Sequence, residues 1–218
     1  MSKIHIYFMP GLAASSSIFE KIKLPENVFE THLLDWIMPE NAETLTMYAE
    51  RMSKLVQHEK AVLIGVSFGG ILVQEMAQFL DIQKIIIISS VKSNKELPSR
   101  MKIAKTTKAY KLIPTSLLSN VDALTKYAFG TIIKERLNMY KKYLIMSDKV
   151  YLDWAIEQVV CWERTIIDDN VIHIHGDNDS VFPVQNIKEY INVKGGTHIM
   201  IVNRYKWFNE NLPNIILK

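Results

Sequence analysis

The sequence has a single cysteine, Cys161, among its 218 residues, so the chain cannot form an internal disulfide. A chain without disulfides is consistent with a reducing compartment. Cys161 lies between two valines and Trp162, and nothing beside it in the sequence would stabilise a thiolate. We therefore interpret Cys161 as a core residue rather than a nucleophile.

Long apolar runs are also missing. No run approaches the length of about 20 residues that a helix needs to cross a bilayer, and the longest candidate, residues 85–88, is only as long as a strand. Residues 1–3 lead directly into an apolar strand, without the longer apolar stretch and the small-residue cleavage site of a signal peptide. We expect a cytoplasmic protein with no stable membrane insertion.

The formal net charge is only +3, which is too small to imply a nucleic-acid partner. The sequence lacks H-E-x-x-H, G-x-x-x-x-G-K-[ST] and C-x-x-C, the motifs typical of several metal, nucleotide and redox sites. We therefore expect no metal and no organic cofactor. The 48% of apolar residues is enough for a large core in one compact domain.

Apolar runs of strand length alternate with helical patterns along most of the chain. Strands are predicted at residues 4–9, 61–66, 84–88 and 171–175, with weaker ones at 31–37 and 190–193. Helices are predicted at 41–56 with Asn41 as N-cap, after residues 67–70 through Leu72 to Leu80, and from Arg204 onward with an interruption at Pro213. This alternation predicts an α/β fold with a mostly parallel sheet of about six strands, flanked by helices.

The alternation stops between residues 92 and 164, where several amphipathic helices are predicted and no strand. We expect this stretch to be a helical cap inserted into a core formed by residues 1–91 and 165–218. The segment from Lys92 to Lys149 carries 13 basic and 4 acidic residues, a net charge of +9, which leaves −6 elsewhere. Its lysines form either a solvated face or a surface that attracts an anionic substrate or an acidic partner. Its apolar residues are expected to line a pocket beneath: Leu112, Ile113, Leu117, Leu118, Tyr127, Phe129, Ile132 and Ile133.

A candidate nucleophile lies between the strand at 61–66 and the following helix. Residues 65–69 read Gly-Val-Ser-Phe-Gly and fit G-x-S-x-G, in the strand–turn–helix context that this motif requires. The turn exposes the hydroxyl of Ser67 near a helix N-terminus, whose dipole favours developing negative charge. The alternative is a glycine-rich turn with a solvated serine.

A serine hydroxyl needs a base within hydrogen-bond reach, and the base needs an orienting acid. Of the six histidines, only His198 follows the last predicted strand, in a Gly-Gly-Thr-His loop, and the alternative is a surface-loop histidine. The acid is expected after the strand at 171–175, where Asp177 and Asp179 both qualify by position. One of the two is expected to form a turn or cap instead. His175 precedes both acids and is interpreted as a structural residue at the end of a strand.

The tetrahedral intermediate of acyl transfer needs backbone N–H donors. One donor usually comes from the residue after the nucleophile, here Phe68, and the second from the loop after the first core strand. In that loop Leu12 follows Pro10 and Gly11, and we expect Leu12 to be the second donor. The alternative for this loop is a simple turn.

With these segments in this order, the sequence resembles the α/β-hydrolase superfamily over nearly the whole chain apart from residues 92–164. Residues 176–183 resemble the family's G-x-x-D-x-x-x-P acid loop, and this resemblance implies that Asp179 rather than Asp177 is the acid. Pro10 stands where many members have histidine. The chain also starts close to the strand before the oxyanion loop, so the antiparallel strands that open many members' sheets are not expected.

The resemblance implies hydrolysis of an ester or thioester of a small-molecule acyl substrate, with Ser67, His198 and Asp179 as catalytic residues and an acyl-enzyme intermediate. One alternative is another reaction of the same three residues, such as carbon–carbon bond hydrolysis or a lyase reaction. A second is a ligand-binding or scaffold protein with little turnover, since a fold does not fix a function.

Overall fold

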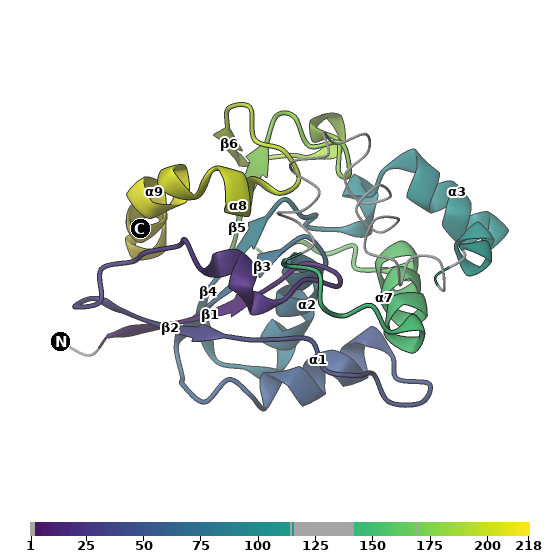
Figure 1. The fold of residues 1–218 in the computed structure, drawn as a ribbon, viewed down its shortest axis with the longest axis horizontal. Helices are drawn as coiled ribbons and strands as arrows, with labels where there is room; N and C mark the ends of the chain where they lie inside the picture. The colour runs from purple at the N-terminus through teal and green to yellow at the C-terminus, as the bar shows by residue number, and fades with distance from the viewer. Residues whose placement is uncertain (1–2, 114, 116–141, 169) are drawn as a thin grey trace.

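The six strands form one sheet in which every neighbouring pair is parallel (Figure 1). The computed structural model describes residues 3–113, 115, 142–168 and 170–218. The sheet order is β2-β1-β3-β4-β5-β6, with β1 at Ile4–Met9, β2 at Phe29–Leu33, β3 at Ala61–Val66, β4 at Ile82–Ile88, β5 at Val171–Gly176 and β6 at Ile191–Val193. The predicted α/β class and the expected sheet of about six strands are confirmed.

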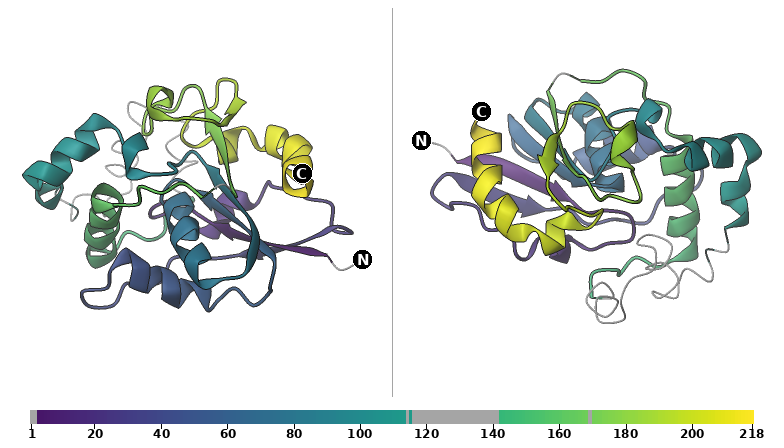
Figure 2. Two further views of the ribbon diagram at one scale, coloured as in Figure 1. Left: turned by 180° about the vertical axis from the view of Figure 1, so that it is seen from behind. Right: turned by 90° about the horizontal axis from the view of Figure 1, so that it is seen from above.

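Helices cover both faces of the sheet (Figures 1 and 2). On one face lie α1 (Leu45–Ser53) and α2 (Phe68–Met76), and on the other α8 (Met200–Asn203) and α9 (Tyr205–Leu217). Every residue of β3 is buried. Leu63 packs with the α1 and α2 layer, whereas the next residue, Ile64, packs with the α8 and α9 layer. Because its side chains alternate between two buried faces, β3 appears in the sequence as a continuous apolar run.

The second strand is shorter and earlier than the predicted range of 31–37. It pairs with β1 from Ile4 opposite Phe29 to Phe8 opposite Leu33. Beyond Leu33 the chain leaves the sheet, and Trp36 is buried where its indole N–H donates to the carbonyl of Gly11 at 2.8 Å. The apolar residues after Leu33 therefore belong to a loop that packs against the loop after β1, and they are not part of the sheet.

Two predicted helix features are wrong. Helix α1 has Thr44 rather than Asn41 as its N-cap, and the Thr44 hydroxyl accepts from the Met47 N–H at 3.3 Å. Ala42 has a φ of 56°, so the chain cannot be helical there. Pro213 lies inside α9 without interrupting it. Proline removes one backbone donor, and the buried apolar residues on both sides of it hold the helix against the sheet: Phe208, Leu212, Ile215 and Ile216.

Within the described part of residues 92–164 the regular secondary structure is helical, apart from one isolated antiparallel bridge between Ala14 and Leu144. It contains α3 (Ser99–Thr107) and α7 (Lys149–Cys161), which pack against each other beyond the carboxyl ends of the strands, on the side away from the N-terminus (Figure 1). Short 3₁₀ helices complete the described structure, at Ser16–Phe19, Ala77–Phe79, Asn94–Glu96, Ala109–Leu112 and Val184–Asn186. None of the helices in the described ranges is both long and apolar enough to span a membrane.

Candidate active site

Ser67 lies at the sharp turn between β3 and α2, as the sequence predicts. Its φ is 53° and its ψ is −120°, a backbone conformation that costs a non-glycine residue about 1–3 kcal/mol. The turn is held by two hydrogen bonds: the Ser67 N–H donates to the Ile88 carbonyl at 2.9 Å, and the Ser90 hydroxyl donates to the Ser67 carbonyl at 2.7 Å. Strain fixed in this way keeps the hydroxyl at the carboxyl edge of the sheet.

Glycine is required at both ends of the motif because backbone passes too close for a side chain. A Cβ at Gly65 would overlap the carbonyl of Gly69, and a Cβ at Gly69 would overlap the carbonyl of Pro10. The two glycines therefore let α2 and the loop after β1 pack directly against the turn.

The structure brings Ser67, His198 and Asp179 together from three loops at the carboxyl edge. His198 Nε2 lies 2.8 Å from the Ser67 hydroxyl, and His198 Nδ1 lies 2.9 Å from Asp179 Oδ2. An ionised carboxylate only accepts hydrogen bonds, so Nδ1 of His198 carries the proton. In the neutral ring Nε2 then accepts from the hydroxyl, which is the arrangement in which a histidine can take a proton from a serine.

Asp179 is buried, and its remaining oxygen is also satisfied. Asp179 Oδ1 accepts from the N–H groups of Val181 at 2.8 Å and Phe182 at 2.9 Å. Burial would raise the pKa of the Asp179 carboxyl, but attraction and a hydrogen bond from His198, together with His175, outweigh burial and lower it. The carboxylate is therefore ionised at neutral pH.

Asp177, the other candidate acid, is exposed and lies in a different environment. Its Oδ1 accepts from the Gly195 N–H at 2.6 Å, which joins the acid loop to the loop that carries His198. The two loops also approach directly, since a Cβ at Gly176 would overlap the carbonyl of Gly196. Asp177 thus occupies a loop-joining position, and Asp179 is the carboxylate hydrogen-bonded to His198.

His175 was interpreted from the sequence as structural only, but it lies beside the acid. Its Nε2 is 2.9 Å from the Phe182 carbonyl and 3.6 Å from Asp179 Oδ2, and its Nδ1 is 3.0 Å from His173 Nε2. A carbonyl only accepts, so Nε2 carries the proton and directs a partial positive charge toward the acid. Burial lowers the pKa of both rings, which keeps them neutral. The signal in the sequence was the spacing of two, which places both histidines on one face of β5.

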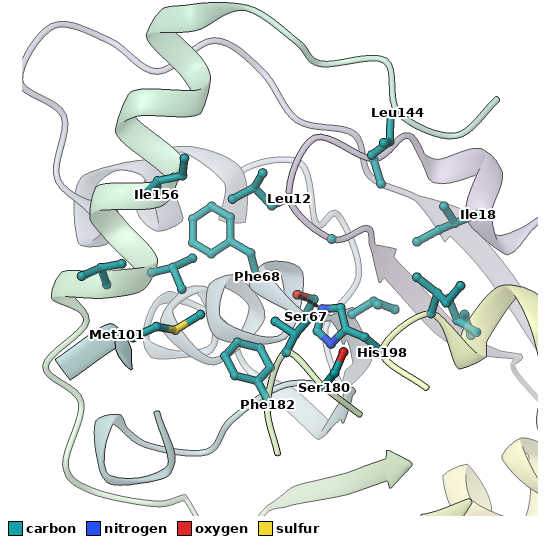
Figure 3. Close-up of a pocket in the computed structure, with 18 of the residues that line it drawn as sticks. Leu12, Ile18, Ser67, Phe68, Met101, Leu144, Ile156, Ser180, Phe182 and His198 are labelled. Carbon is teal, nitrogen blue, oxygen red and sulfur yellow. Dashed lines mark hydrogen bonds between the residues drawn. The ribbon is translucent and has the colours of Figure 1, made fainter. Parts of the chain in front are cut away.

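The two expected oxyanion donors lie next to Ser67. A Cβ built on Gly11 would be 3.4 Å from the Ser67 Cβ, so the loop after β1 touches the turn, and Leu12 and Phe68 both border the same cavity (Figure 3). Among the described residues, neither the Leu12 N–H nor the Phe68 N–H donates to another protein group. The loop is held by Tyr151 of α7, whose hydroxyl accepts from the Ala13 N–H at 3.2 Å.

Ser67 and His198 open into a cavity of about 580 Å³ with mostly apolar walls (Figure 3). The core contributes Leu12, Ile18, Phe68, Val181, Phe182 and Val202, and residues 92–164 contribute Met101, Ala104, Tyr110, Ile113, Leu144, Ile156, Val159 and Val160. A cavity of this size suits a small organic molecule. Its walls therefore favour an apolar group beside Ser67.

The expected pocket residues are found in part. Ile113 lines the cavity, but Leu112 is 83% exposed and points away from it. The expectation for Leu112 is wrong because Leu112 is the last residue of the short 3₁₀ helix at Ala109–Leu112 and faces solvent there. The other six predicted lining residues lie outside the described residues: Leu117, Leu118, Tyr127, Phe129, Ile132 and Ile133.

Comparisons with known proteins rest on structure alone. No family model and no curated protein matches the sequence. Similar solved structures include a carboxylesterase of Nitrososphaera gargenis (15% identity, TM-score 0.69, 99% of this chain and 90% of that one). Also similar is an enol-lactonase of Burkholderia xenovorans, with 15% identity and a TM-score of 0.68 over 100% of this chain and 93% of that one. A bromoperoxidase of Bacillus anthracis has 18% identity and a TM-score of 0.67 over the same shares of the two chains. With its six-stranded parallel sheet and flanking helices, the chain has the α/β-hydrolase fold.

Proposed function

We propose that this protein is a serine hydrolase that cleaves a carboxylic ester or thioester through an acyl-enzyme intermediate. The observation that carries the proposal is the pair of hydrogen bonds that joins Ser67, His198 and Asp179 at one end of an apolar cavity. Two of the similar structures are named a carboxylesterase and an enol-lactonase, which supports this class of reaction.

In the proposed mechanism the Ser67 hydroxyl attacks the substrate carbonyl while His198 Nε2 takes its proton. Asp179 stabilises the resulting imidazolium, and the N–H groups of Leu12 and Phe68 stabilise the oxyanion. His198 then gives the proton to the leaving group, which departs and leaves the acyl group on Ser67. A water molecule, activated by His198, attacks the acyl-enzyme and releases the acid.

The cavity indicates the chemical class of the substrate. Its walls are mostly aliphatic and aromatic, and among the described residues Arg100 is the basic residue that borders it besides His198. One Arg100 nitrogen already donates to the carbonyls of Ser180 and Val181, at 3.0 and 2.7 Å. We propose a neutral, apolar acyl group of intermediate size, enclosed on one side by the described part of residues 92–164 acting as a cap. Attraction of an anionic substrate or an acidic partner, suggested by the +9 charge of residues 92–149, stays a prediction.

A fluorophosphonate probe tests the proposed chemistry without knowledge of the natural substrate. We expect rapid labelling of the folded protein at one site, located at Ser67 by peptide mass spectrometry, because the probe reacts with base-activated serines. Heat-unfolded protein is the control and should not react. If the folded protein does not react, the chain is a binding or scaffold protein, and the proposal is wrong.

Met101→Trp tests the assignment of the cavity. Met101 borders the cavity from α3, so a larger side chain should shorten the space for the acyl group. We expect kcat/KM for octanoate esters to fall at least about tenfold, while kcat/KM for acetate esters changes little.

The matched control is Ile103→Trp, on the same helix but 62% exposed and outside the cavity. It should leave the ratio of kcat/KM between octanoate and acetate esters unchanged. Equal effects of the two variants on this ratio would show that the acyl group binds elsewhere.

A further inference from the structure

Three histidines that take no part in the proposed reaction meet at the other end of the sheet. His5 lies on β1, His32 on β2 and His58 in the irregular segment between α1 and β3. One ring nitrogen from each lies within 4.8 Å of the other two. His58 precedes β3 and Ser67 follows it, so the cluster and the serine are separated by roughly the 20 Å length of a six-residue strand.

The topology explains why these side chains meet. In the β1–β2 pair, His32 lies opposite Tyr7. Tyr7 follows His5 by two residues on β1. Side chains two apart on a strand share a face, so His5, Tyr7 and His32 project on the same side of the sheet. His58 then approaches from the loop on that side, and its ring stacks on His5 with centroids 3.5 Å apart.

We propose that His5, His32 and His58 form a binding site for a divalent transition metal of the zinc class. Imidazole nitrogens are suitable ligands for zinc, and the pair nearest to coordination geometry is His5 Nδ1 and His32 Nε2, 3.0 Å apart. Two nitrogens on a tetrahedral zinc ion are about 3.3 Å apart, given Zn–N bonds of about 2.0–2.1 Å. The separation of these two nitrogens is therefore within a few tenths of an ångström of that in a zinc site, and the two rings must turn so that both lone pairs point at the ion.

His58 is the ligand that must move. Its ring is parallel to that of His5, at an interplanar angle of 7°, whereas a nitrogen lone pair lies in the plane of its ring. His58 must therefore rotate to direct a nitrogen at the ion, and it lies half-buried in a loop rather than on a strand.

Tyr7 supplies the orienting group that metal-bound histidines usually have. Its hydroxyl lies 2.6 Å from His58 Nδ1 and accepts from the Gln57 N–H at 3.0 Å. When His58 carries its proton on Nδ1 and donates it to the Tyr7 oxygen, Nε2 keeps its lone pair and is available to the ion.

Because two ligands come from paired strands and the third from the loop before β3, the bound ion would fasten the edge strand β2 to the rest of the sheet. The site is thus structural and separate from the hydrolase chemistry. Its test does not depend on the identity of the substrate or on the function of Ser67.

Titration of tag-free, metal-stripped protein with zinc chloride in a calorimeter tests the proposal. We expect one equivalent to bind with a Kd below about 10 μM, and a higher Tm in the presence of zinc. His58→Gln should weaken binding at least tenfold while leaving ester hydrolysis unchanged, and His32→Gln should do the same.

The matched control is His198→Gln, which removes a histidine from the other end of the sheet and should bind zinc like the wild type. Cobalt bound in place of zinc should give a visible absorption band that His58→Gln abolishes. The proposal is wrong if the wild type binds no zinc at 100 μM, or if His58→Gln and His32→Gln bind as tightly as the wild type. It is also wrong if only His198→Gln loses binding.

Discussion

Ser67→Ala is expected to reduce kcat for ester hydrolysis by about a thousand-fold or more while the protein stays folded. The hydroxyl is the proposed nucleophile, and His198 cannot replace it. The variant should keep its Tm within a few degrees, because the Ser67 backbone hydrogen bonds and the strained turn do not involve the lost oxygen. Steady-state kinetics on a chromogenic ester, with thermal melting in parallel, measure both quantities.

Ser99→Ala is the matched control, since Ser99 is an exposed serine at the start of α3. It should hydrolyse the ester at the wild-type rate. The acyl-enzyme mechanism would be wrong if Ser67→Ala retained more than about a tenth of wild-type activity, because the residual activity expected after loss of a nucleophile is far lower.

Asp179→Asn is expected to lower kcat by about three to four orders of magnitude. An amide at this position can donate to Nδ1 of His198, which would place the ring proton on Nε2 and prevent it from accepting the Ser67 proton. The two acceptor bonds from Val181 and Phe182 to the side-chain oxygen are retained in the amide. The loss therefore reports the histidine tautomer rather than the loop conformation.

Asp177→Asn is the paired variant and should lower kcat less than about tenfold. Asp177 is exposed, and an amide oxygen can still accept from the Gly195 N–H. Kinetics of both variants at pH 7 distinguish the two roles. The reverse ranking, with Asp177→Asn the more damaging change, would exclude Asp179 as the orienting acid.

The parts of the site that could be predicted from the sequence are those encoded locally. The Ser67 turn needs a strand, two glycines and a helix in direct succession, and all of these are contiguous in the chain. The position of His198 after two glycines is equally local. The spacing in the acid loop selected Asp179 through its resemblance to a family pattern, and the structure places this carboxylate, rather than Asp177, against His198.

The parts that could not be predicted depend on turns and contacts that the local sequence pattern does not show. The limits of β2 are set by its pairing with β1, which the sequence of 31–37 does not show. The choice of Thr44 over Asn41 depends on the turn at Ala42, since both residues are good N-caps. His175 looks like any polar residue in a strand until Phe182 folds back onto it. In each case contacts or turns that the local pattern does not show decide between local options that are similar in energy.

Two parts of the chain form the cavity, and they contribute different features to it. The hydrogen bonds that join Ser67, His198 and Asp179 run between core loops, whereas much of the apolar wall comes from α3, α7 and their neighbours. Substitutions in that wall can alter which molecule fits without disturbing the hydrogen bonds that join Ser67, His198 and Asp179. If these residues act as proposed, a lineage with this arrangement could acquire new substrates by mutation in α3 and α7 while keeping the same catalytic residues.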